Sequence, residues 1–281
     1  MSTPYRVEGP ALISVSGGRT SGFMLRQIID AHGGKLPDDV IPVFCNTGRE
    51  HEATLKFLHE IETRWCPIVW LEYRYRPDAE RIHGFEVVSY CSASRQGEPF
   101  EQMIRAKNFL PNPVMRLCTS ELKIRTGNRY AKDVLGWAEW TRAVGLRADE
   151  PRRVARMKGD IEAEDVACPM HRAGHGLGEV REFWSAQDFD LQLPGDDPAF
   201  GNCDLCFLKK RAKIEKVLLT EPSRGEWWAR QEERGHADGT AGGKFRNDRP
   251  TYRQMMTQLT VQGRLLDDAI EDDTLPCMCH D

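Results

Sequence analysis

The sequence contains no long hydrophobic stretch and no strong excess of charge of either sign. Its longest apolar runs, such as residues 11–15 and 40–45, are far shorter than the roughly 20 residues that a membrane-spanning helix needs. The 39 basic and 43 acidic side chains give a formal net charge of −4, which provides no overall positive field to attract nucleic acid, although it allows a local basic groove. The N-terminus also lacks the basic-then-apolar pattern of a secretion signal. We therefore expect a cytoplasmic protein that does not engage a membrane.

No repeat, coiled coil or low-complexity tract is visible in the sequence. Hydrophobic residues make up 40% and charged residues 29% of the 281 positions, which is the composition of an ordinary globular protein. A chain of this length buries a substantial core, so we expect one large domain or a core domain with an annex.

The nine cysteines are an odd number, and no export signal precedes them, so we do not expect a disulfide framework. Cys45, Cys66 and Cys91 lie within or beside apolar, strand-like runs, and we predict that they are small buried hydrophobic side chains. The cysteines that need another explanation are a C-x-x-C pair, a C-x-C pair and one isolated residue: Cys203 with Cys206, Cys277 with Cys279, and Cys118.

Short apolar runs alternate along the chain with segments whose hydrophobic residues recur at helical spacing. Strands are predicted at residues 11–15, 40–45, 67–73, 86–90 and 141–146. This alternation predicts an α/β fold in which a parallel sheet of about five strands has helices on both faces. We place a core domain at residues 1–200. A cysteine-containing, mainly helical region at residues 201–281 is expected to close over its site, with a mobile glycine-rich loop at 235–247.

A glycine-rich turn, residues 16–22, joins the first predicted strand to a helix. In such a turn several backbone N–H groups point at a common centre, and the helix dipole adds positive charge there. Gly17 and Gly18 allow positive φ and the close approach of a phosphate. Ser16, Thr20 and Ser21 add hydroxyls and Arg19 adds charge, so the turn predicts a phosphate-binding loop; a purely steric turn is the alternative. Its spacing does not fit a Walker motif.

With these motifs the sequence resembles the PP-loop adenine-nucleotide α-hydrolase superfamily, and within it the phosphoadenosine phosphosulfate (PAPS) reductase family in the broad sense. Further blocks similar to those of the family follow in the same order, at residues 46–48, 53–55, 118–124, 145–153, 169–170, 193–194 and 201–206. Three departures are visible: Thr20 where ATP-using loops usually carry Asp, Thr119 where the reductases have a second cysteine, and a different C-terminal block. The resemblance implies an adenine nucleotide α-hydrolase-like fold, with residues 1–200 as the PP-loop nucleotide-binding domain.

The resemblance also implies a [4Fe–4S] cluster, because thiolates favour iron–sulfur clusters and such a cluster takes four of them. Cys118, Cys203 and Cys206 would supply three ligands. The fourth would be Cys277, with Cys279 as the other candidate and Cys168 as a weaker one. A four-thiolate zinc site and free redox thiols remain open as alternatives.

For the nucleotide, the resemblance implies binding by the phosphate loop and by residues of later blocks: Asn46, Thr47, Gly48, Gly145, Arg147 and Arg153. Arg147 and Lys123 would act in catalysis on phosphate or sulfate oxygens. Cys279 beside His280 is a candidate thiolate nucleophile. Glu150 would either pair with an arginine or help to hold Mg²⁺ on a triphosphate.

Two further patterns leave a choice open. The basic run at residues 209–213 is either an ordinary basic helix or a patch that guides a polynucleotide toward the cysteines. Trp227 and Trp228 are either core residues or platforms on which bases stack.

The leading hypothesis is an iron–sulfur-dependent PP-loop ATP pyrophosphatase. It would use ATP with Mg²⁺ to adenylate a substrate for sulfur transfer, with a nucleic acid as the substrate class considered. The alternatives are a sulfonucleotide reductase that releases sulfite from an adenylated sulfate with a thiol reductant, and a non-catalytic nucleotide or cluster sensor. The partners considered are an adenine nucleotide, a nucleic-acid substrate, a thioredoxin-like or cysteine-desulfurase donor, and a second copy of the chain in a homodimer.

Overall fold

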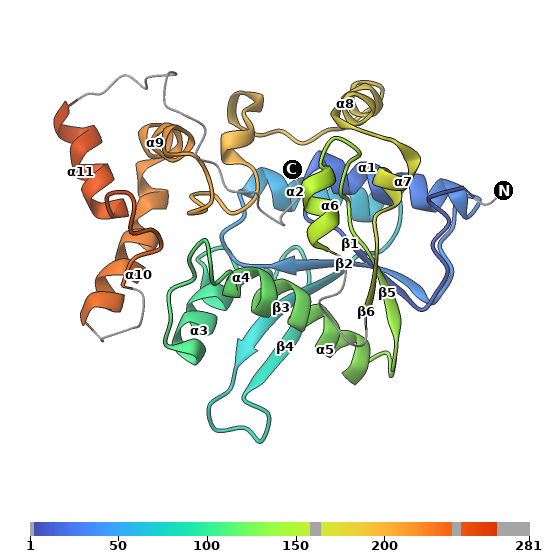
Figure 1. Cartoon of the computed structure of the whole chain (residues 1–281), viewed down its shortest axis with the longest axis horizontal. Coiled ribbons are helices and arrows are strands. Elements are labelled where there is room, and N and C mark those ends of the chain that lie inside the picture. Colours follow the sequence, from blue (N-terminus) through green and yellow to red (C-terminus); the bar gives the residue numbers. More distant parts are fainter. Residues whose placement is uncertain (1–2, 158–163, 238–242, 263–281) are drawn as a thin grey trace.

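The computed structural model describes residues 3–157, 164–237 and 243–262 (Figure 1). In chain order its elements are β1 (Ala11–Ser14), α1 (Arg19–Ala31), β2 (Val40–Asn46), α2 (Glu52–Arg64), β3 (Val69–Tyr75), β4 (His83–Val88), α3 (Glu98–Lys107), α4 (Leu117–Thr119), the π-helix η1 (Ser120–Arg125), α5 (Thr126–Asp133), β5 (Trp140–Ala143), α6 (Pro151–Arg156), β6 (Glu164–Ala167), α7 (Pro169–Ala173), α8 (Leu177–Ser185), the short 3₁₀ turns η2 (Pro194–Asp196) and η3 (Pro198–Phe200), α9 (Arg211–Thr220), the 3₁₀ turn η4 (Pro222–Arg224), α10 (Gly225–Ala237) and α11 (Tyr252–Gln262).

The strands form one six-stranded sheet in the order β4-β3-β2-β1-β5-β6. Five strands are parallel, and β4 runs antiparallel to β3 at one edge, with Trp70 opposite Val88 and Tyr75 opposite His83. The predicted α/β fold with about five parallel strands is therefore confirmed. The antiparallel direction of β4 and the presence of β6 were not anticipated.

Alternate residues of the central strands enter two different cores, as expected of strands covered on both faces. Ile13, Phe44 and Trp70 pack with α1, α2 and α8, whereas the neighbouring Leu12 and Leu71 pack with side chains of α5. Helices α1 and α2 lie on one side of the sheet, and α3 and α5 lie on the other (Figure 1).

The C-terminal helices α9, α10 and α11 form a mainly helical part beside the sheet (Figure 1). Trp228 and Phe245 are fully buried there and join the same apolar cluster as Phe44 and Phe100. Phe245 lies in the stretch 235–247, for which the sequence predicts a mobile loop. It is instead a core residue, because its ring stacks on Phe207 at a centroid distance of 5.6 Å and packs against Trp228. In the described part of the chain, no helix is long and apolar enough to cross a bilayer.

The prediction that Cys45, Cys66 and Cys91 are small buried hydrophobic side chains is correct in part. Cys45 and Cys66 pack against the two cores, and burial raises the pKa of each thiol to about 11, which keeps both protonated at neutral pH. Cys91 is exposed, so the prediction was wrong there. It lies in a turn after β4, where the amide of Ser92 donates to the carbonyl of Ser89 and the chain leaves the sheet.

Candidate functional site at the carboxyl edge of the sheet

The glycine-rich loop lies between β1 and α1 and is stabilised by its own hydroxyls. The Ser21 hydroxyl donates to the Gly18 carbonyl at 3.0 Å and accepts hydrogen bonds from both the amide and the hydroxyl of Ser16 at 3.1 Å. Gly17 has φ of +85°, and a Cβ there would lie 2.4 Å from the Thr54 methyl group. Only glycine fits that position, because both the backbone conformation and the contact with α2 exclude a side chain.

The N-terminus of α1 follows directly, with Gly18 as its N-cap, a residue that has no side chain to accept from the first amides. Such an end offers N–H donors and partial positive charge to an anion. Gly145, which follows β5, approaches it so closely that a Cβ there would lie 3.5 Å from the Ser21 Cα. The ends of β1 and β5 therefore frame the place where we predicted the phosphates.

The Arg19 side chain connects the start of α1 to a later segment of the chain. Its guanidinium binds both carboxylate oxygens of Asp190 at 2.8 Å, the Asp196 carboxylate at 2.5 Å and the Leu191 carbonyl at 3.0 Å. These contacts hold the segment before η2 against the start of α1. The structure thus shows a connecting role for Arg19, and its role in binding a phosphate stays a prediction.

Arg147 lies beside the loop and is held by acidic neighbours. One of its nitrogens, Nη1, donates to the Thr20 hydroxyl at 3.3 Å, while Nε donates to Asp149 at 2.9 Å. Glu150 accepts from the Arg147 amide at 3.1 Å and pairs with Arg153. The structure therefore brings Arg147, Arg153 and Glu150 together next to Thr20, in the arginine pairing that was one of the two roles predicted for Glu150.

The loop that follows β2 is fixed by a buried acid. Asn46 donates to Glu72 at 2.6 Å and to the Ser94 carbonyl at 2.8 Å, and its own oxygen accepts from the Gly48 amide. Gly48 has φ of +78°, and a Cβ there would lie 2.9 Å from the Gly97 backbone. Asn46 and Gly48 thus shape the loop, and Glu72, which the sequence analysis did not single out, holds it in place.

Thr47 connects this loop to the C-x-x-C turn. Its hydroxyl donates to Glu50 at 2.9 Å and lies 3.4 Å from the Cys203 sulfur, and residues 50 and 203 form an antiparallel bridge. Glu50 is almost fully buried; burial raises its pKa although the charge of Lys123 acts in the opposite direction. Lys123, one of the predicted catalytic residues, is therefore close enough to Glu50 for their charges to interact.

A buried ion pair holds the C-x-x-C turn against the sheet. Asp204, between the two cysteines, pairs with Arg49 and accepts from the Trp228 indole at 2.8 Å. The Arg49 guanidinium lies 5.2 Å from the centre of a Trp227 ring. Trp227 and Trp228 are 3% and 0% exposed, which confirms them as core residues.

Lys209 helps to shape the same turn. Its ammonium donates to the carbonyls of Ala199, Gly201 and Asp204 at 2.7–2.9 Å. Helix α9 begins only at Arg211, which pairs with Glu215 four residues later. The first residue of the basic run is therefore turned inward onto the backbone, and this favours a structural role over polynucleotide guidance.

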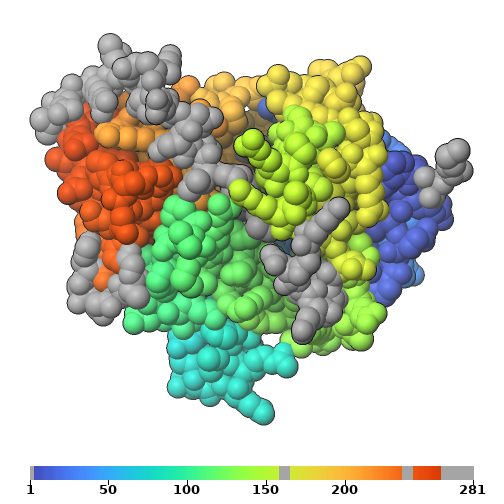
Figure 2. Space-filling view, in the orientation of Figure 1, coloured from blue at the N-terminus to red at the C-terminus, as the bar shows by residue number. Residues whose placement is uncertain are grey.

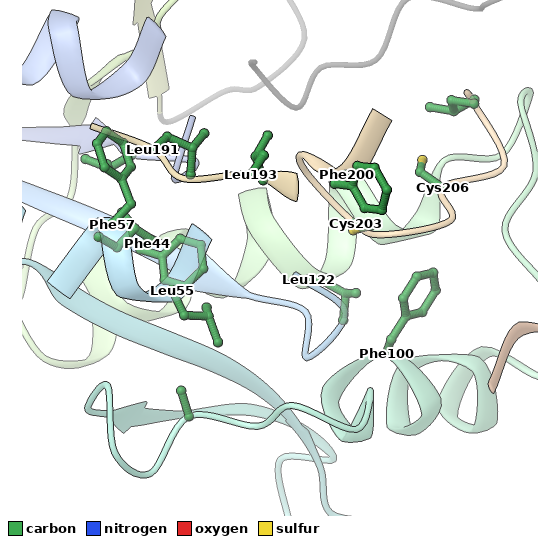
Figure 3. Close-up of a cluster of buried hydrophobic side chains, with 14 of the residues drawn as sticks. Phe44, Leu55, Phe57, Phe100, Leu122, Leu191, Leu193, Phe200, Cys203 and Cys206 are labelled. Carbon is green, nitrogen blue, oxygen red and sulfur yellow. The ribbon is translucent and has the colours of Figure 1, made fainter. Parts of the chain in front are cut away.

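The structure describes three of the four predicted thiolate ligands. Cys203 and Cys206 lie on one loop beside Phe200, near Leu122 of η1 (Figure 3), and the Cys206 amide donates to the Cys203 carbonyl at 3.3 Å. Cys118 lies in α4 and is half-buried, whereas Cys277 and Cys279 lie outside the described residues. Within the described ranges, no three His, Cys, Asp or Glu side chains come together as a metal site. Two thiols on one turn suit an iron–sulfur cluster or a zinc ion, but each of these sites takes four ligands.

Cys168, the weaker ligand candidate, is buried at the end of β6 against Val144 and Leu146. Burial raises the pKa of its thiol, as expected of an unreactive core cysteine.

These features define a class of protein: an α/β sheet with helices on both faces, with a glycine-rich loop between its first strand and first helix and a C-x-x-C turn beside the loop that follows β2. No family model matches the chain. A protein of Escherichia phage lambda, described as "Uncharacterized nin region protein ORF290", is 31% identical over an alignment of 215 residues, and the match covers 72% of this chain and 67% of that protein. The chain belongs to the family of this phage protein.

Two solved structures are also similar to the chain. One is PAPS reductase from Candida auris in a phosphate complex, with 13% identity, coverage of 65% of this chain and 78% of that chain, and a TM-score of 0.37. The other is the U34-tRNA thiolase NcsA from Methanococcus maripaludis with its [4Fe-4S] cluster, with 12% identity, coverage of 98% and 80%, and a TM-score of 0.39. The first belongs to the family that the sequence motifs resemble. At these scores neither similarity carries an argument about activity.

Proposed function

We propose that the protein is a PP-loop ATP pyrophosphatase that adenylates a substrate for sulfur transfer. The observation that supports this proposal best is the contact between Thr47 and Cys203. It joins the loop after β2, next to the phosphate loop, to a turn that carries two thiols. Chemistry on a nucleotide and chemistry on sulfur would then take place within one site.

In the proposed reaction, an oxygen of the substrate attacks the α-phosphorus of ATP, and the bond between the α- and β-phosphoryl groups breaks. The N–H groups at the start of α1, together with Arg147, would stabilise the negative charge that develops on the leaving pyrophosphate. Mg²⁺ would neutralise the triphosphate. The terminal sulfur of a donor persulfide would then attack the activated carbon, so that a carbon–sulfur bond forms as the carbon–oxygen bond to AMP breaks. A thioredoxin-like dithiol would supply two electrons to cleave the remaining sulfur–sulfur bond, which releases the donor thiol and leaves the sulfur on the substrate.

The cluster ligands that we propose are Cys118, Cys203, Cys206 and Cys277. When bound, a [4Fe–4S] cluster would hold the sulfur species near the nucleotide. The residues of this chain have separate tasks: Arg49 and Asp204 fix the C-x-x-C turn, and the Thr47 hydroxyl, which donates to Glu50, contacts the Cys203 sulfur at 3.4 Å.

A second candidate function is a sulfonucleotide reductase, which one contact favours. Thr20 stands where ATP-using loops carry Asp, and its hydroxyl accepts from Arg147. This pair offers an anion a donor and a positive charge instead of a carboxylate for Mg²⁺. In this reaction a thiolate, with Cys279 as candidate, would attack the sulfur of an adenylated sulfate and displace the adenylate. A thioredoxin-like dithiol would then reduce the adduct and release sulfite.

The test begins with protein purified without oxygen, in which iron and acid-labile sulfide are counted. Pyrophosphate release from ATP and sulfite release from adenylated sulfates are then measured. We expect pyrophosphate release to be lost in Ser21→Ala, and iron to be lost in Cys203→Ser but kept in Cys91→Ser, which changes an exposed thiol outside the site. Sulfite release that depends on Cys279 would favour the reductase. Nucleotide binding with neither product would overturn both proposals.

A further inference from the structure

The charges of this protein are unevenly distributed along the chain. Residues 105–132 contain seven basic side chains and a single acidic one, a net charge of +6, so the other residues together carry −10. The basic residues are Arg105, Lys107, Arg116, Lys123, Arg125, Arg129 and Lys132. This segment runs from the end of α3 through η1 into α5, so one contiguous structural unit is strongly basic on an acidic protein.

Three of these cations meet on one buried carboxylate. Glu121, which is 1% exposed, binds Lys107 at 2.9 Å, Arg129 at 3.4 Å and also Arg125. Burial alone would raise the pKa of Glu121, but the three cations outweigh it and keep the carboxyl ionised. One negative charge thus holds three positive ones together, and the basic cluster, defined as Lys107, Arg125 and Arg129, keeps an excess of about two positive charges.

The basic cluster retains donors for a further anion. The Arg125 side chain is 60% exposed. Arg129 is largely buried, with its guanidinium 5.9 Å from the centre of the Tyr73 ring, so Arg125 is the member of the cluster that faces a ligand in solution. Because guanidinium donors match phosphate oxygens, the cluster is suited to a phosphodiester.

Two further cations on the same helices are exposed. Arg105 of α3 is 64% exposed, and Lys132 of α5 is also exposed. Figure 2 shows the green part of the chain, to which α3 and α5 belong, as a broad outer face of the molecule. Several exposed cations carried by α3, η1 and α5 suit a chain of phosphates better than they suit one small anion.

The π-helix places this surface next to the candidate site. Glu121, Lys123 and Arg125 are spaced two residues apart along η1. Lys123 interacts electrostatically with Glu50 of the candidate site, and Arg125 belongs to the basic cluster. From this geometry we infer that the face formed by α3, η1 and α5 binds the phosphate backbone of a nucleic acid and guides it toward Lys123. This inference rests on the proposed function, because it identifies the substrate of that site as a nucleic acid.

The experiment measures fluorescence anisotropy of labelled 24-nucleotide RNA and DNA, single-stranded and duplex, with the full-length protein between 50 and 200 mM salt. The double variant Arg125→Gln/Lys132→Gln changes exposed residues outside the catalytic set. At 100 mM salt we expect its dissociation constant to rise about tenfold. The slope of log affinity against log salt should become shallower by roughly 1.4 for single strands or 1.8 for duplexes, as for two lost phosphate contacts. The RNA, DNA, single-strand and duplex arms identify the backbone that is bound.

The matched control, Arg64→Gln/Arg253→Gln, removes the same charge from positions that are 42% and 41% exposed elsewhere. Wild-type affinity in the Arg125/Lys132 variant, or an equal loss in the control, would overturn the inference, as would binding of poly-glutamate in place of nucleic acid. ATP binding and pyrophosphate release without nucleic acid are measured in parallel and should not change in this variant. Failure of the proposed function would appear there, separately from loss of nucleic-acid binding.

Discussion

Replacing Asp204 by Asn tests whether the ion pair in the C-x-x-C turn holds the molecule together. Asp204 is 1% exposed and accepts from Arg49, the Trp228 indole and the Leu205 amide. The Asn side chain has the same size but no charge, so Arg49, itself 7% exposed, would be left as an uncompensated buried cation. Loss of one partner of a buried pair costs about 3–5 kcal/mol in the free energy of unfolding.

That cost can be converted into a melting temperature. An entropy of unfolding near 2.1 cal/mol/K per residue amounts to about 0.6 kcal/mol/K for a chain of this length, so the expected loss is roughly 5–8 °C. Thermal unfolding followed by circular dichroism measures it. The matched control is Asp188→Asn, because Asp188 is 77% exposed in its pair with Arg64 and an exposed pair contributes about 1 kcal/mol or less.

Equal shifts in the two Asn variants would refute the reasoning, because burial would then make no difference. A double variant adds a second test. Arg49→Met with Asp204→Asn removes both charges at once and keeps an amide oxygen that can accept from the Trp228 indole. We expect it to be more stable than Asp204→Asn alone, because no buried charge is left unpaired.

Two further changes have defined outcomes. Gly17→Ala should unfold at a lower temperature and lose ATP binding, because its methyl group would meet Thr54; Gly33→Ala, also at positive φ but with open space, should lose only about 1 kcal/mol and keep binding. Burial raises the pKa of Glu232 from 4.5 to about 7, so the folded state holds a proton that the unfolded state loses, and stability should fall as pH rises from about 4.5 to 7. Glu232→Gln should flatten this decline and melt above the wild type at pH 8 in the same thermal scans. The expectation for Glu232 would be contradicted if the melting temperature of Glu232→Gln fell with pH as steeply as that of the wild type. The expectation for the glycines would be contradicted if Gly17→Ala and Gly33→Ala bound ATP equally well.

Much of the sheet could be predicted because its strands are short apolar runs separated by helical patterns. Leu12 and Ile13 illustrate why this works: neighbours on a doubly covered strand are both apolar, whichever core they enter. The direction of β4 was missed because the predicted strands, 67–73 and 86–90, leave residues 74–85 between them, which is long enough for a crossover. In the structure only residues 76–82 separate β3 from β4, and this connection is short enough to require a hairpin.

The phosphate loop was predictable because its chemistry is contiguous in the sequence. Glu50, Glu72 and Asp204 were missed because their roles depend on partners that are distant along the chain: Asp204 meets Arg49 across 155 positions. The π-helical turn of η1 was also missed, because the run 120–135 has the spacing of an ordinary helix. Cys91 shows the opposite error, since apolar neighbours in the sequence did not bury it.

The pairing of residue 49 with residue 204 also affects how the polypeptide folds during synthesis. The N-terminal half leaves the ribosome first, carrying an arginine whose carboxylate partner has not yet been translated. The loop after β2 therefore lacks its contacts with the C-x-x-C turn and Trp228 until about four-fifths of the chain is made. We expect this loop to reach its final packing late in synthesis, because contacts between distant parts of the chain form slowly.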